Sequence, residues 1–117
     1  MRILNLNNKN IMIYNDSMIN TADDIADLMV KAKSNCNSNL IGLDATKLPS
    51  MFFDKTSGMI DTFSQKMTMN GIKMAIFGDF SAYNQTEVIK YVKEKKYDNI
   101  MFFVSSRPEA IKLLQEK

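Results

Sequence analysis

Short apolar runs alternate with amphipathic stretches along this chain. Residues 2–6 and 10–14 alternate apolar and polar side chains, and the pair Asn7-Asn8 lies between them. This pattern predicts two strands joined by a tight turn. Three later runs are almost continuously apolar, as is typical of strands covered on both faces. They span residues 40–43, 72–77 and 100–104.

Four stretches between or after these strands carry helix signals. Three of them begin with a residue that favours a helix N-terminus, followed within a turn by an acid. These pairs are Thr21 with Asp24, Asn84 with Glu87, and Ser106 with Glu109. The fourth helix is predicted over residues 54–69, and Asn70-Gly71 supplies its left-handed end. The helix residues expected to face the core are Ile25, Leu28, Met29, Ala32, Met59, Ile60, Phe63, Met67, Val88, Tyr91, Val92, Ile111 and Leu114.

The predicted order of elements is β-β-α-β-α-β-α-β-α, in a single α/β domain over residues 1–117. Because strands alternate with helices from the second strand onward, we expect a mostly parallel sheet with right-handed crossovers. We expect the first strand to pair antiparallel at one edge of that sheet. An exposed edge strand also offers a surface for a second copy, so the sequence leaves a homodimer open.

Composition and charge exclude several classes of function. The net charge of +2 is too small to predict a nucleic-acid partner. The chain has no apolar run long enough to span a bilayer and no secretory signal, and Cys36 has no partner for an internal disulfide, so we expect a cytoplasmic protein. The absence of histidine removes Ser-His-Asp and Cys-His catalysis and nearly all zinc sites. We therefore assign no catalytic residues and no cofactor.

Polar residues follow several predicted strands, at the edge of a parallel sheet where ligands usually bind. They include Asp16, Asp44, Asp79 and Ser105. One interpretation is that the three carboxylates hold Mg²⁺, which prefers oxygen ligands, in a phosphoryl-transfer module. The other is structural, because Asp and Ser also end strands and begin turns or helices.

The connection after Leu43 is the strongest candidate for function. Thr56-Ser57-Gly58 lies near a predicted helix N-terminus, which attracts anions and would tolerate an attached phosphate. Phe52-Phe53 is either an exposed pair that docks a partner or part of the core. The candidate phosphoacceptor and interaction surface comprises Asp44, Phe52, Phe53, Asp54, Thr56 and Ser57.

Several segments resemble a small bacterial family known as domain of unknown function 4180 (DUF4180). The resemblance covers almost the whole chain and implies no function. It rests on residues 21–28, Phe52-Phe53-Asp54 with residues 56–58, residues 72–81, and Phe102-Phe103-Val104-Ser105.

The order of elements is also similar to the STAS domain of sulfate transporter tails and anti-sigma factor antagonists. In that family a strand ending in Leu-Asp is followed by Asp-Ser-Ser-Gly at a helix start, and a partner kinase phosphorylates the first serine. Leu43-Asp44 matches the strand end, Thr56 matches the phosphoacceptor, and Ser57 matches the second serine. Lys55 stands where the family has aspartate, and Asp54 lies one position early.

The STAS resemblance implies a STAS-like, non-enzymatic regulatory or protein-interaction module, possessing a phosphorylation switch at Thr56 or Ser57. The implied partner is an unidentified protein. The residues leave two alternatives open: a Mg²⁺-binding module using Asp16, Asp44 and Asp79, and a small-ligand-binding domain at the same sheet edge. A deep apolar pocket at that edge would favour the small-ligand alternative.

Overall fold

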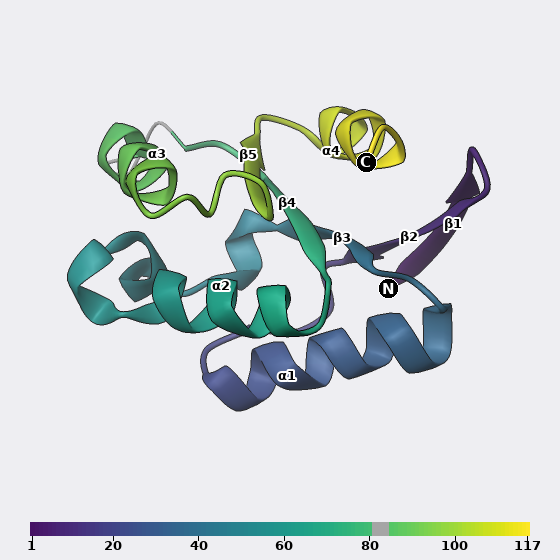
Figure 1. The fold of residues 1–117 in the computed structure, drawn as a ribbon, viewed down its shortest axis with the longest axis horizontal. Helices are drawn as coiled ribbons and strands as arrows, with labels where there is room; N and C mark the ends of the chain where they lie inside the picture. The colour runs from purple at the N-terminus through teal and green to yellow at the C-terminus, as the bar shows by residue number, and fades with distance from the viewer. Residues whose placement is uncertain (81–84) are drawn as a thin grey trace.

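The computed structural model describes residues 1–80 and 85–117 and shows one five-stranded sheet in the strand order β1-β2-β3-β4-β5 (Figure 1). The strands are β1 (Arg2–Leu6), β2 (Lys9–Tyr14), β3 (Leu40–Asp44), β4 (Lys73–Phe77) and β5 (Met101–Val104). Strand β1 pairs antiparallel with β2 at one edge, and the other neighbours pair in parallel. The predicted α/β fold, with a mostly parallel sheet and an antiparallel edge strand, is confirmed.

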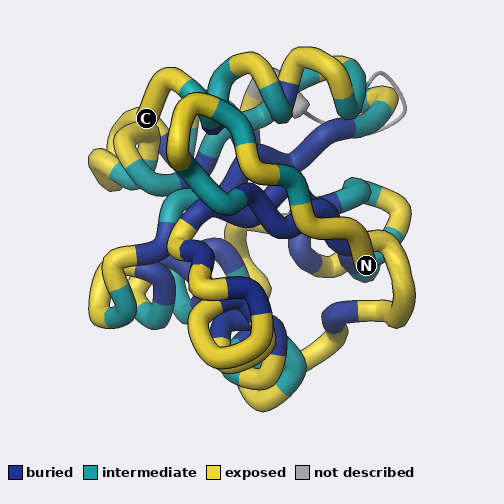
Figure 2. The backbone as a smooth tube through the Cα atoms, turned by 90° about the vertical axis from the view of Figure 1, so that its right-hand side faces the viewer, coloured by how far each residue is buried: buried dark blue, intermediate teal, exposed yellow. Residues whose placement is uncertain are grey.

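Four α-helices lie within the described residues, and their core contacts divide them unequally between the two faces of the sheet. They are α1 (Ala22–Val30), α2 (Met59–Met69), α3 (Gln85–Glu94) and α4 (Arg107–Gln115). Side chains of α1, α2 and α3 share one apolar cluster with one face of the sheet, whereas α4 packs on the opposite face. Figure 2 shows the result as a buried centre with helices whose outward sides are exposed.

Alternation along the strands creates the two core clusters, because successive side chains point to opposite faces. On the central strand β3, Ile41 and Leu43 face the α1, α2 and α3 cluster, whereas Leu40 faces α4. Gly42 also lies on the α4 side. A Cβ there would come within 2.7 Å of the Ile13 side chain, so glycine leaves the room that Ile13 needs.

Local sequence signals explain several element boundaries. Asn7 and Asn8 have φ values of 53° and 62°, the left-handed conformation that a two-residue hairpin turn requires. The Thr21 hydroxyl accepts a hydrogen bond from the Asp24 amide, and the Asp24 carboxylate accepts one in return from the Thr21 amide. Ser106 caps α4 in the predicted way. The predicted cap at Asn84 lies outside the described residues.

Helix α1 continues into a π-helical turn over Lys31–Asn35 before the chain reaches β3. Single π-turns inside or at the end of helices often occur at functional sites. In the described part of the chain, no helix combines the length and the apolar character needed to cross a membrane.

Candidate functional site

The connection from β3 to α2 is built from three short 3₁₀ turns rather than from a long helix start. These turns span Ala45–Lys47, Ser50–Phe53 and Lys55–Ser57. The prediction that α2 begins near Asp54 was therefore wrong, because Gly58 adopts φ 79° and the helix begins at Met59. Residues 54–57 form an exposed loop, which we call the Asp54–Gly58 loop together with its terminal glycine.

The Asp54 carboxylate holds the first part of this loop. Its Oδ1 atom accepts hydrogen bonds from the Thr56 amide at 2.9 Å and from the Thr56 hydroxyl at 2.7 Å. Both bonds favour the ionised carboxylate, the side-chain bond most, and together they lower the pKa of Asp54 below its ordinary value. Thr56 is thus exposed to solvent, and its hydroxyl already donates a hydrogen bond to the Asp54 carboxylate.

Ser57 has the opposite hydrogen-bonding role. Its Oγ atom accepts a bond of 3.2 Å from the amide of Met59, the first residue of α2. The first amides of a helix lack intrahelical partners and form its positive end. The Ser57 hydroxyl therefore lies beside backbone N–H donors of α2, whereas the Thr56 hydroxyl lies beside a carboxylate acceptor.

The same turn occurs at the end of β3. Asp44 Oδ1 accepts from the Thr46 amide at 3.0 Å and from the Thr46 hydroxyl at 2.8 Å. Asp44-Ala45-Thr46 and Asp54-Lys55-Thr56 thus share one sequence pattern and one structure. This repeated pattern was a signal in the sequence that could have identified both turns.

The two phenylalanines of the candidate surface lie in the core. Phe52 is fully buried and Phe53 is 8% exposed, so neither presents an aromatic surface for a partner. Their rings pack edge to face with centroids 5.1 Å apart, and Phe52 also lies against Phe63 of α2. The burial of both side chains contradicts the interpretation that the pair docks a partner and supports the interpretation that it belongs to the core. The buried pair anchors the chain just before the exposed loop.

Helix α3 lies beside the loop. Lys55 Nζ and Glu87 Oε2 are 3.3 Å apart, and both side chains are at least half exposed, so this ion pair contributes little stability. A pocket of about 220 Å³ lies between the loop and α3, with Phe53 and Val88 as its apolar part. It is smaller than typical ligand pockets and has a polar rim, so it does not favour the small-ligand alternative.

The three strand-end acids do not form a metal site. Asp16 accepts a hydrogen bond of 2.6 Å from the Met1 amino group, and Asp44 is committed to its own turn. Within residues 1–80 and 85–117, which include Asp79, no three acidic or cysteine side chains lie together so that they could hold a metal ion. The arrangement of these acids therefore contradicts the Mg²⁺ interpretation. Asp44 has the structural role instead, because it ends β3 and begins a turn.

A family model described as a domain of unknown function (DUF4180) matches residues 6–114. No curated protein and no solved structure matches the chain.

Proposed function

Because this chain belongs to the DUF4180 family, whose description gives no function, we propose a function from the geometry of the Asp54–Gly58 loop. The protein acts as a non-enzymatic regulatory module that binds a partner protein through this loop, and phosphorylation of Thr56 releases the partner. The observation that carries the proposal is the exposed Thr56 hydroxyl hydrogen-bonded to the Asp54 carboxylate.

Charge explains why this position suits a switch. A phosphate on Thr56 would remove the hydroxyl donor and place a charge of nearly −2 beside a carboxylate that now accepts its hydrogen bond. Repulsion between the two groups would open the turn and move the Thr56 amide away from Asp54. A modification at one atom would therefore change the shape of the whole loop.

The neighbouring serine should respond differently. A phosphate on Ser57 would lie by the positive end of α2 and would accept hydrogen bonds from its free amides. Such a group is compatible with the present loop. Thr56 is therefore the residue at which modification disrupts the surface, and Ser57 is the matched position for comparison.

A cross-linking experiment in the native host tests the proposal. A photoreactive residue replaces Lys55 in the loop, and a second variant carries it at exposed Lys112 of α4, on the opposite face of the sheet, as a control for non-specific capture. We expect one discrete adduct from position 55, lost with Thr56→Glu and kept with Thr56→Gln. Equal capture by the Glu and Gln variants, or the same adduct from position 112, would refute the switch. Tandem mass spectrometry of peptides from the host protein then shows whether Thr56, rather than Ser57, is phosphorylated.

A further inference from the structure

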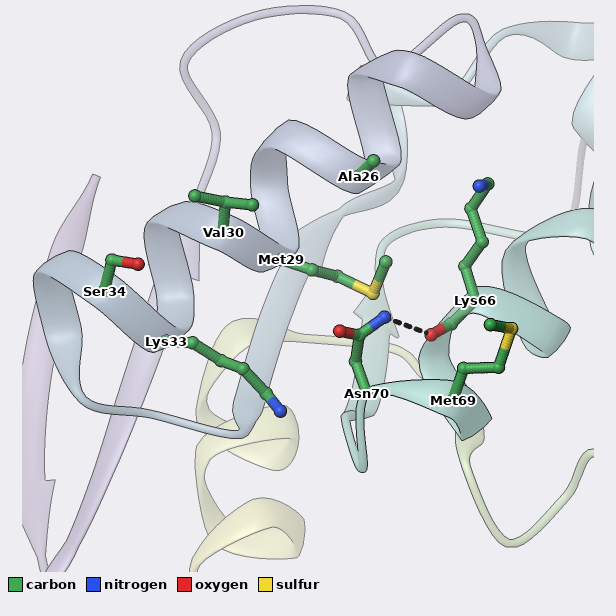
Figure 3. Close-up of a pocket in the computed structure, with 8 residues that line it drawn as sticks. All are labelled: Ala26, Met29, Val30, Lys33, Ser34, Lys66, Met69 and Asn70. Carbon is green, nitrogen blue, oxygen red and sulfur yellow. Dashed lines mark hydrogen bonds between the residues drawn. The ribbon is translucent and has the colours of Figure 1, made fainter.

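A second surface lies between the carboxyl-terminal halves of α1 and α2, away from the Asp54–Gly58 loop. Here residues 26–34 of α1 and its π-turn face residues 66–70 of α2 across a groove of about 290 Å³ (Figure 3). Its lining positions on α1 repeat at three- and four-residue intervals, so they form one continuous helix face. We call it the α1–α2 groove.

The groove collects exposed apolar side chains. Met69 is 84% exposed and Val30 is 61% exposed, and these are the two most exposed large apolar side chains of the described residues. Met29, which is buried, forms part of the floor and reaches from α1 toward α2 in Figure 3. Exposed apolar surface gathered at one place indicates an interaction site, and methionine adapts well to varied partners.

The charged residues of the groove all have one sign. Lys33 from the π-turn of α1 and Lys66 from α2 line it, and none of its lining residues is acidic. Among the described residues, the ion pairs present lie elsewhere, at Asp16 and at Lys55 with Glu87. Each lysine also complements the negative end of its helix. That role does not explain why exposed Val30 and Met69 lie beside them.

The size and shape of the groove indicate which kind of partner it can bind. The groove is just below the usual range for a small-molecule site, but it has room for one or two large side chains. Two helices packed side by side present a ridge-lined groove that a third helix can fill. Asn70 ends α2 by donating to the Lys66 carbonyl at 2.8 Å, so this side of the groove is fixed (Figure 3).

We propose that the α1–α2 groove binds an amphipathic helix of a partner protein whose apolar face is flanked by acidic residues. Its apolar anchors contact Val30 and Met69, and its carboxylates pair with Lys33 and Lys66. This binding mode is the general one in which a helix places its apolar face in a groove. The opposite charges select the partner and orient it.

A peptide titration tests the proposal with the full chain. The probe is a synthetic amphipathic helix of Leu, Ala and Glu, and its counterpart has Lys in place of every Glu. We expect the acidic peptide to shift NMR amide signals of residues 26–34 and 66–70, and added salt to weaken its binding. Met69→Asp, or Lys33→Gln together with Lys66→Gln, should each weaken binding about tenfold.

Matched variants and a second probe make the result decisive. Met18→Asp and Lys93→Glu change an exposed methionine and an exposed lysine elsewhere and should leave binding unchanged. Circular dichroism establishes that each variant is folded. The proposal is overturned if the basic peptide binds as well as the acidic one, if the shifts lie elsewhere, or if neither peptide binds. Vesicles of anionic phospholipid that bind through Met69 when the peptide does not would assign the groove to a membrane instead.

Discussion

The Tyr91 hydroxyl donates a hydrogen bond of 2.5 Å to Asp61 Oδ2, which joins α3 to α2. The Tyr97 hydroxyl donates to the other oxygen of the same carboxylate at 2.8 Å. One acid thus holds two tyrosines from α3 and the turn that follows it. Because α3 also lies beside the Asp54–Gly58 loop, this cluster fixes one wall of the candidate site.

Removal of the Tyr91 hydroxyl should destabilise the protein by about 1.5–3 kcal/mol, the usual range for a hydrogen bond to a charged group. The measurement is chemical denaturation of Tyr91→Phe. The same substitution in an Asp61→Ala background should cost much less, because the acceptor is already absent. Equal costs in the two backgrounds would show that the hydroxyl contributes through something other than Asp61.

Alkaline pH should weaken the same cluster. The hydrogen bond to Asp61 is the main cause that raises the pKa of Tyr91 from 10.0 to about 12, with burial next. The folded state therefore keeps its proton where the unfolded state has lost it. This contribution to stability is complete below pH 10 and is lost as pH rises from 10 to about 12.

Thermal melts between pH 10 and 12 measure whether the protein loses stability as pH rises, as the raised pKa of Tyr91 predicts. We expect the melting temperature of the wild type to fall more steeply above pH 10 than that of Tyr91→Phe. Burial and Asp61 also raise the pKa of Tyr97, so Tyr91→Phe should retain part of the slope. Parallel curves for the two proteins would contradict the assignment.

Local patterns in the sequence predicted most of the fold. The turn at Asn7-Asn8, the Thr21–Asp24 capping box and the Ser106 cap each depend on residues close in the chain. The start of α2 was misplaced because Asp54 and Ser57 are also good helix caps. In the structure they make isolated turns, and the left-handed Gly58 separates those turns from the helix.

Long-range contacts account for what local patterns could not predict. Asp61 is 30 residues from Tyr91 and 36 from Tyr97, so no local spacing reveals their cluster. The two walls of the α1–α2 groove, residues 26–34 and 66–70, are likewise far apart in the sequence, so no local spacing reveals the groove. The sequence left Phe52 and Phe53 open between surface and core, and only packing against Phe63 and its neighbours decides the matter.

Substitution of Ser64 should stabilise the protein. Its Oγ atom is buried and has no hydrogen-bond partner in the part of the chain that the structure describes. Ser64→Ala removes this desolvated hydroxyl and improves helix propensity, so the free energy of unfolding should rise by about 1 kcal/mol. Gln65→Ala at the adjacent exposed position is a control for propensity alone. A loss of stability in Ser64→Ala would mean that the hydroxyl has a partner.

The hydrogen bond from the Thr56 hydroxyl to Asp54 leads to a prediction for the pKa of Asp54. Thr56→Val keeps the shape of the side chain and removes its hydroxyl, so the pKa of Asp54 should rise toward its ordinary value. An NMR titration of the Asp54 carboxyl carbon measures this directly. Thr56→Ser keeps a hydroxyl donor and should retain the lowered pKa, and Ser57→Ala should leave it unchanged because Ser57 Oγ bonds to Met59. If Thr56→Val titrates like the wild type, the hydroxyl does not hold the turn, and the switch proposed at Thr56 loses the hydrogen bond on which it rests.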